Sequence, residues 1–210
     1  MTSLAPWSPM PHQLALSCPQ CAGQACFDFV VARPIERKAD VPFFQAHPLL
    51  EYWKEQDNCG HYHHYALYFP GLHGDPMQSL GPLPDGYSPS HWQRSAYWYR
   101  DHGLDLGSVR CEHCHYAARH HLNWPGEAYF SVLYKGQMLW AFNRESALAL
   151  HDYLGSAERN PGGYPWRSFL RHIPGPFKSR KARQPLTRSL KRLLTPCLLY
   201  TSPSPRDQRG

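Results

Sequence analysis

Two Cys-x-x-Cys pairs, Cys18/Cys21 and Cys111/Cys114, constrain this chain more than any other feature. Each such turn places two thiolates on one side of a metal ion, and two turns complete the four-ligand shell that Zn²⁺ prefers. The 89 residues between Cys21 and Cys111 must therefore leave the site and return to it. We predict one zinc ion in a closed shell of these four cysteines. Its role is structural, because no coordination position is left for water.

The residues around the two pairs predict a mixed α+β fold. Residues 24–32 alternate as a strand after the first pair, and residues 116–122 form a strand after the second. Residues 33–107 are an insertion between them. It is predicted to hold a helix at 47–56, an aromatic strand at 61–69, a Gly/Pro-rich loop at 70–89 and a second helix near 92–101.

The chain after the second pair predicts a hairpin and two helices. Residues 129–134 and 137–142 pair about Lys135-Gly136. Asn143 caps the helix that follows, Glu145 suits its first turn, and Gly155 ends it. A final amphipathic helix begins near Leu186. The predicted division is a loose leader at 1–17, an α+β domain at 18–156 with the insertion at 33–107, and a basic C-terminal helical segment at 157–196.

These knuckles resemble those of the zinc-ribbon superfamily, which implies a split zinc ribbon with a long insertion. The segment 111–154 looks like a group of uncharacterised bacterial zinc-ribbon proteins, through Cys114-His-Tyr116, His121-Leu-Asn-Trp-Pro-Gly-Glu-Ala-Tyr-Phe130 and Leu139-Trp-Ala-Phe-Asn-Arg144. The resemblance brings no activity with it. Ribbon knuckles usually have Gly directly after the second Cys, whereas Ala22 and His115 stand there in this chain.

Positive charge is concentrated near the C-terminus. Residues 1–158 hold 10 Lys/Arg and 15 Asp/Glu, whereas residues 159–196 hold 10 Lys/Arg and no acid. A basic segment beside a zinc site predicts binding to the phosphates of nucleic acid. A solvated basic helix, or one docked on the acidic body of the same chain, is the alternative. The predicted contact residues are Lys178, Arg180, Lys181, Arg183, Arg188, Lys191 and Arg192.

Two other functions remain open on the sequence. The aromatic insertion could dock another protein, with the zinc site as scaffold. A metal-dependent hydrolase could instead use His61, His63 and His64, because alternate strand residues share a face. We favour a role other than catalysis, since these histidines are more simply polar residues of an aromatic strand.

The cellular compartment can also be predicted from the sequence. No signal peptide is evident in the first residues, and no run approaches the ~20 apolar residues of a membrane span, so a reducing cytoplasm is expected.

Residues 197–207 look like one translated frame of a transposase-type sequencing adapter, and residues 208–210 look like its barcode. Cys197 then has no functional weight, and the gene's own product continues differently. A genuine Ser/Pro-rich tail is the alternative.

Overall fold

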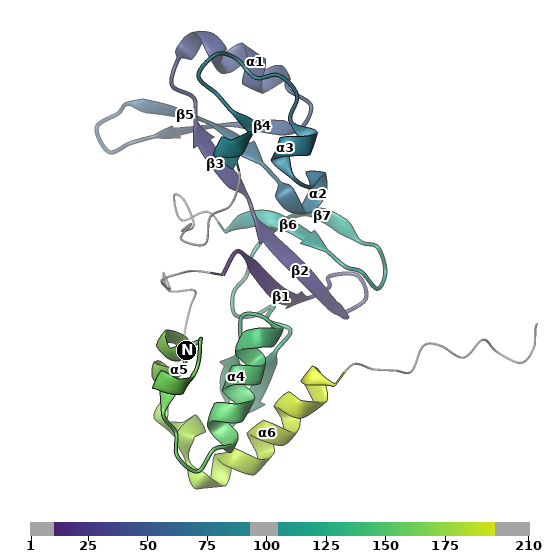
Figure 1. Ribbon diagram of the computed structural model, residues 1–210, viewed down its shortest axis with the longest axis vertical. Coiled ribbons are helices and arrows are strands. Elements are labelled where there is room, and N and C mark those ends of the chain that lie inside the picture. The colour runs from purple at the N-terminus through teal and green to yellow at the C-terminus, as the bar shows by residue number, and fades with distance from the viewer. Residues whose placement is uncertain (1–10, 93–104, 196–210) are drawn as a thin grey trace, which may run out of the picture.

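The computed structural model describes residues 11–92 and 105–195. It confirms the α+β class, with antiparallel sheets along an elongated body, helices α1 to α3 in its upper part and α4 to α6 at its lower end (Figure 1). Three sheets are present in these residues, with strand orders β1-β2-β6-β7, β3-β5-β4 and β8-β9. The strands are β1 (Gln13–Ser17), β2 (Gln24–Phe29), β3 (Val31–Pro34), β4 (Leu50–Gln56), β5 (Tyr62–Tyr68), β6 (Leu106–Arg110), β7 (Ala117–His121), β8 (Ser131–Tyr134) and β9 (Gln137–Trp140).

The helices are short except for two near the C-terminus, α4 and α6. The α-helices are α1 (Val41–Ala46), α2 (Pro70–His73), α3 (Pro76–Ser79), α4 (Arg144–Gly155), α5 (Arg167–Arg171) and α6 (Arg180–Leu194). Single 3₁₀ turns are η1 (Lys38–Asp40), η2 (Pro89–Trp92), η4 (Pro161–Gly163) and η5 (Gly175–Lys178). The second helix predicted in the insertion, near 92–101, falls almost entirely outside the described residues.

The four-stranded sheet explains how the two Cys pairs meet. Each pair lies in the turn of an antiparallel hairpin, β1-β2 for the first and β6-β7 for the second. Strands β2 and β6 pair antiparallel, with Cys26 opposite Arg110, so the start of β2 lies beside the end of β6. Both turns therefore emerge at one edge of the sheet, although 89 residues separate them along the chain.

The strand predicted at 24–32 divides between two sheets. The Val30 amide bonds to the Leu106 carbonyl at 3.1 Å, after which the chain leaves β6 and enters β3. Figure 1 shows β2 and β3 as one long ribbon that joins the middle sheet to the upper one. The insertion thus begins as a direct continuation of the hairpin strand that carries the first Cys pair.

The helix predicted at 47–56 is wrong, and strand β4 stands there instead. Pro48 disfavours the helical conformation of the residue before it, and His47 is extended at φ −70° and ψ 125°. Helix α1 therefore ends at Ala46. All seven residues of β4 then pair with β5, the strand that the aromatic pattern predicts. Sheet pairing supplies backbone hydrogen bonds and cross-strand contacts that local helix preference lacks.

The hairpin and the helix after it match the prediction closely. Strands β8 and β9 pair around the Lys135-Gly136 turn. The Asn143 side chain accepts a hydrogen bond from the Ser146 amide, and the Ser146 hydroxyl accepts one from the Asn143 amide, each at 2.9 Å. This reciprocal capping box fixes the start of α4, with Glu145 in its first turn.

The last helix begins six residues earlier than predicted, at Arg180. Proline inside a helix removes one hydrogen bond, so local sequence disfavours a helix that contains Pro185. The structure keeps Pro185 within α6. The Ser179 hydroxyl caps the Ala182 amide at 3.3 Å, and burial of Ala182 together with Leu186 offsets the lost bond.

One apolar core joins the middle sheet to the lower helices. Leu16 and Phe27 from the sheet, Leu150 from α4 and Leu190 from α6 are all 0% exposed and belong to the same cluster. The leader predicted over 1–17 therefore contains a buried strand, β1, at its C-terminal end. Two smaller clusters, on opposite faces of β3-β5-β4, form the core of the insertion.

Candidate metal centre and charged surfaces

The two knuckles have the same backbone geometry. Each is a six-residue loop, 18–23 or 111–116, with cysteine at its first and fourth positions. In the first, the Cys18 amide donates to the Gly23 carbonyl at 2.7 Å. In the second, the Cys111 amide donates to the Tyr116 carbonyl at 2.8 Å. The site is therefore built by two equivalent hairpin turns that flank the β2-β6 pair. The two loops are equivalent in structure although their sequences differ.

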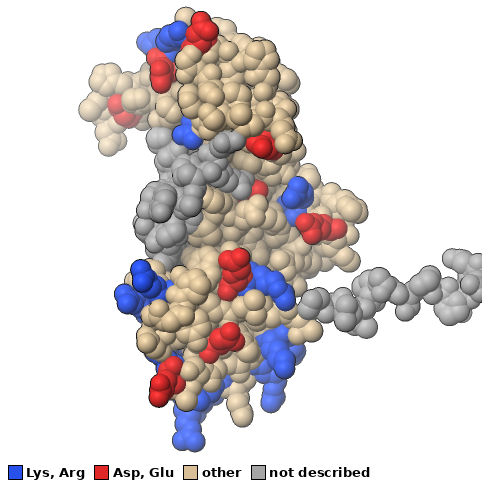
Figure 2. All heavy atoms as spheres, viewed as in Figure 1, with Lys and Arg blue, Asp and Glu red and all other residues tan. Residues whose placement is uncertain are grey.

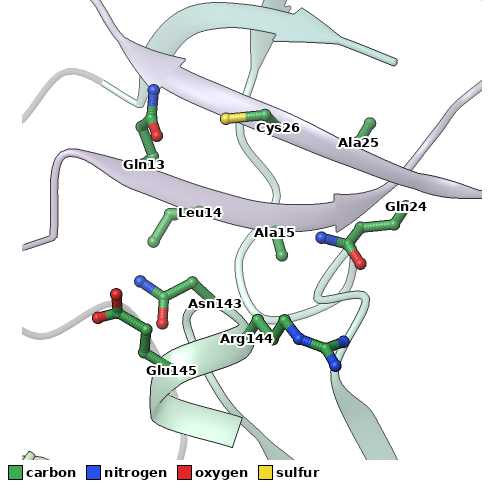
Figure 3. Close-up of a pocket in the computed structure, with 9 residues that line it drawn as sticks. All are labelled: Gln13, Leu14, Ala15, Gln24, Ala25, Cys26, Asn143, Arg144 and Glu145. Atoms are coloured by element: carbon green, nitrogen blue, oxygen red, sulfur yellow. The ribbon is translucent and has the colours of Figure 1, made fainter. Parts of the chain in front are cut away.

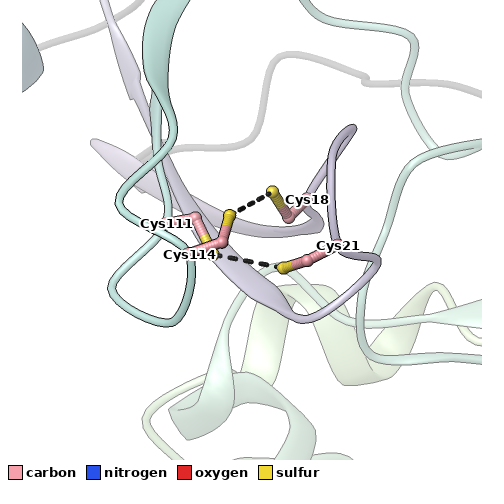
Figure 4. Close-up of side chains that lie close together, drawn as sticks. All are labelled: Cys18, Cys21, Cys111 and Cys114. Atoms are coloured by element: carbon pink, nitrogen blue, oxygen red, sulfur yellow. Dashed lines mark hydrogen bonds between the residues drawn. The ribbon is translucent and has the colours of Figure 1, made fainter.

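The four thiols converge as the sequence predicts, and their spacing fits a tetrahedral metal. All four sulfur atoms lie within 4.8 Å of one another (Figure 4). The Sγ atoms of Cys18 and Cys114 are 3.6 Å apart, and so are those of Cys21 and Cys111. A tetrahedron of sulfurs about 2.3 Å from a central zinc ion has edges of about 3.8 Å. The cluster can therefore hold one metal ion with little rearrangement.

The acidities of these thiols show why a cation suits the cluster. Burial raises the pKa of Cys18, but the backbone amides of Cys21 and Gln20 act with the neighbouring thiols to lower it to about 7. The Tyr116 amide lowers the pKa of Cys114, yet burial and the three other thiols raise it to about 12. One thiolate therefore forms near neutral pH, and its negative charge disfavours ionisation of the next thiol. A divalent ion would supply the positive charge that lets all four ionise.

The residue after each second cysteine adopts a left-handed backbone conformation. Ala22 has φ 57° and His115 has φ 60°. Both occupy the fifth position of their loops, where zinc-ribbon knuckles usually have glycine, and glycine adopts this conformation without steric cost. In this chain, each knuckle instead has a strained residue with a side chain at that position.

The three histidines of the hydrolase hypothesis do not point to one centre. The His64 ring hydrogen-bonds the Tyr52 hydroxyl at 2.5 Å, whereas His63 Nε2 lies 3.0 Å from Asp57 Oδ2 and His61 Nδ1 lies 3.5 Å from the same atom. The hydrogen bond from His63 and the amide of His61 keep the pKa of Asp57 below its usual value. Within residues 11–92 and 105–195, the four cysteines form the only group with metal-ligand spacing. The hydrolase hypothesis stays a prediction without an assembled three-ligand site.

Most aromatic side chains of the insertion serve its own core. Tyr65, Tyr68 and Trp92 are buried, whereas Tyr62 is 53% exposed with the Lys54 ammonium 3.6 Å from its ring centre. The predicted protein-docking surface also includes residues 97–99, which lie outside the described part of the chain. That alternative therefore stays a prediction.

An open cavity of about 280 Å³ lies where β1 and β2 meet the start of α4 (Figure 3). Polar side chains line much of it, including Gln13, Gln24 and Asn143. Arg144 and Glu145 place one charge of each sign at the same helix turn. The cavity therefore shows no preference for anions, and it does not extend the basic surface described next.

Five of the seven predicted nucleic-acid contacts are exposed on α6: Arg180, Lys181, Arg188, Lys191 and Arg192. Figure 2 shows most of the visible Lys and Arg atoms around the lower end of the molecule, where Figure 1 places α6. The remaining two are turned partly inward. The Lys178 ammonium donates to the Arg171 carbonyl at 3.5 Å, and Arg183 is half-buried with its Nε enclosed.

Among the described residues, no helix is both long and apolar enough to cross a membrane. Comparisons of the chain with protein-family models, with curated proteins and with solved structures found no match.

Proposed function

We propose that the four cysteines bind one structural zinc ion that clasps together the two hairpins on either side of the insertion. The observation that carries this is the convergence of four sulfurs, from two hairpin turns of equal geometry, within 4.8 Å. A shell of four thiolates has no open position, so the ion contributes folding free energy rather than chemistry. We infer that the two knuckles form a zinc ribbon divided by residues 33–107.

The zinc content of a cysteine variant tests the clasp. Cys114→Ser is expected to reduce bound zinc from one per chain to nearly none and to lower the melting temperature, because a neutral hydroxyl replaces a thiolate ligand. Cys59→Ser is the matched control, since Cys59 is exposed and lies outside the cluster. Elemental analysis and thermal melts measure both effects. Equal zinc content in the two variants would contradict the proposal.

We further propose that the zinc-stabilised protein binds nucleic acid through the exposed face of α6. Helix α6 carries six basic residues and no acid. At about 100° per residue, the five exposed basic residues fall within an arc of about 120°, opposite Leu186. From Arg180 to Arg192 this face extends for about 18 Å. Such a row of cations attracts a polyanion and gains free energy by releasing its counterions.

The other face of α6 shows how the helix is held. Leu186 and Leu190 are 0% exposed within the core that also contains α4. A helix that binds membranes inserts its apolar face into lipid, but here that face is already occupied by the protein core. Across the described residues, no carboxylate forms an ion pair with the basic side chains of α6. The basic face is therefore free to contact phosphates.

Titration of labelled DNA and RNA at several salt concentrations tests this function. If about four or five phosphates are contacted, log K should fall against log salt with a slope of about −4. The double variant Arg180→Gln with Lys191→Gln should reduce the slope by about 2. The control, Arg144→Gln with Lys38→Gln, removes the same charges from exposed sites outside α6 and should leave the slope unchanged. No binding, or binding independent of salt, would exclude this function.

A further inference from the structure

The exposed face of α6 divides into a middle strip and two margins by helical angle, and Gln184 in the middle strip is its uncharged amide side chain. The exposed residues fall at helical angles that place Lys181, Gln184 and Arg188 along its middle, at the spacing i, i+3 and i+7. Arg180 and Lys191 lie toward one margin, and Arg192 lies toward the other. All of these side chains are exposed, and the α6 sequence contains no aromatic residue.

The middle strip is suited to hydrogen-bonding base edges. Arginine recognises guanine with its rigid fork of two hydrogen bonds to O6 and N7, lysine reaches the same atoms without that fork, and glutamine recognises adenine through N6 and N7. Basic side chains at the margins are placed to contact the phosphates on either side of a groove, which positions a helix without reading sequence. A helix with its side chains is about 10–12 Å wide, and the major groove of B-form DNA is about 12 Å wide.

The surroundings of α6 allow it to approach a duplex. The helix forms the outer boundary of the lower end of the molecule in Figure 1. Leu186 and Leu190 anchor the opposite side, so the arc of about 120° that carries the exposed basic side chains belongs to a fixed helix. Single-stranded nucleic acid is bound largely by aromatic stacking, and double-stranded RNA has a major groove too narrow for side chains. The exposed face of α6 therefore fits neither single-stranded nucleic acid nor double-stranded RNA.

From these features we propose that α6 is a recognition helix that enters the major groove of double-stranded DNA, with Lys181, Gln184 and Arg188 reading bases. This inference rests on the proposed nucleic-acid function and adds the class of ligand and the reading residues. Arg180, Lys191 and Arg192 hold the helix against the two phosphate backbones.

Selection of the zinc-loaded full chain against a random double-stranded DNA library tests the inference. The native protein should enrich a short motif that contains guanine. Arg188→Lys keeps the charge but loses the two-bond geometry, so discrimination between this motif and a scrambled duplex should fall about tenfold. Arg192→Lys is the matched control at the margin and should leave discrimination unchanged. The salt dependence of binding should be the same in all three proteins, because their charges are the same.

The outcomes separate this inference from the proposed function. Salt-dependent binding without an enriched motif would overturn the recognition helix and leave phosphate binding intact. Equal or tighter binding to single-stranded DNA or to double-stranded RNA would also overturn it. No binding to any nucleic acid would remove the proposed function, and the inference with it.

Discussion

Ala22 and His115 show how single residues shape the metal centre. Each has a positive φ directly after the second cysteine of its knuckle. A residue with a side chain in this conformation costs roughly 1–2 kcal/mol relative to the ordinary helical or extended regions. The strain occurs twice, at equivalent positions, so both turns hold a conformation that local preference alone disfavours.

Replacement of Ala22 by glycine is expected to stabilise the protein by about 0.5–1 kcal/mol, because relief of the strained φ exceeds the added entropy of the unfolded chain. Ala117→Gly is the control, since Ala117 is also exposed but lies in strand β7. It should destabilise by about 0.5–1 kcal/mol. Chemical denaturation of the zinc-loaded proteins measures both changes, and effects of the same sign would contradict the strain argument.

Helix α6 is the element whose two faces have different roles. Its apolar residues recur every four positions, at Ala182, Leu186, Leu190 and Leu194, and all are buried. They pack into the cluster that includes β1, β2 and α4. The basic segment predicted at 157–196 therefore carries part of the core of the molecule as well as its charge.

Leu190→Ala tests this structural role. The leucine is 0% exposed, so its removal should cost about 2–5 kcal/mol in the free energy of unfolding. Leu148→Ala is the same substitution on α4, where the side chain is 42% exposed, and should cost less than about 1 kcal/mol. Denaturant unfolding followed by tryptophan fluorescence compares them. A basic tail independent of the core would instead give small losses in both variants.

In the molecule as a whole, the candidate metal centre belongs to the larger core and not to the insertion, since Cys18 and Cys111 are buried in the cluster that contains Leu16. The insertion buries Phe44, Tyr68 and Trp92 in a cluster that contains no residue of the knuckles. An ion pair between Glu51 and Arg119 joins β4 to β7, but it is partly exposed and contributes little. The zinc ion would thus join the two hairpins at one end of the β2-β6 pair, whereas the insertion leaves from the other end, where Phe29 pairs with Gly107.

Metal removal should therefore open the molecule in stages. With a chelator, amide hydrogen exchange should first accelerate in β1, β2, β6 and β7, while β4 and β5 keep their protection longer. The same chelator presaturated with zinc is the control. Simultaneous loss of protection in both sheets would show that the insertion depends on the metal for its own fold.

Features that depend on local pattern could be predicted from the amino-acid sequence alone. The two Cys-x-x-Cys pairs, the hairpin about Lys135-Gly136 and the cap at Asn143 could all be read from neighbouring residues, because turn and cap chemistry acts over a few positions. The concentration of basic residues after Arg159 was likewise evident from composition. The grouping of the four cysteines followed from their spacing alone, since two such pairs can complete one metal shell.

Tertiary structure decided the features that depend on partners distant in sequence. Strand β4 forms because β5 pairs with it, and this pairing outweighs the local preference of residues 47–56 for a helix. Helix α6 continues through Pro185 because its leucines are buried against α4 and the middle sheet. The β2-β6 pairing places the knuckles side by side, and burial of one face of α6 decides which basic side chains remain exposed. These outcomes follow from contacts between segments far apart in the chain, and no local pattern encodes them.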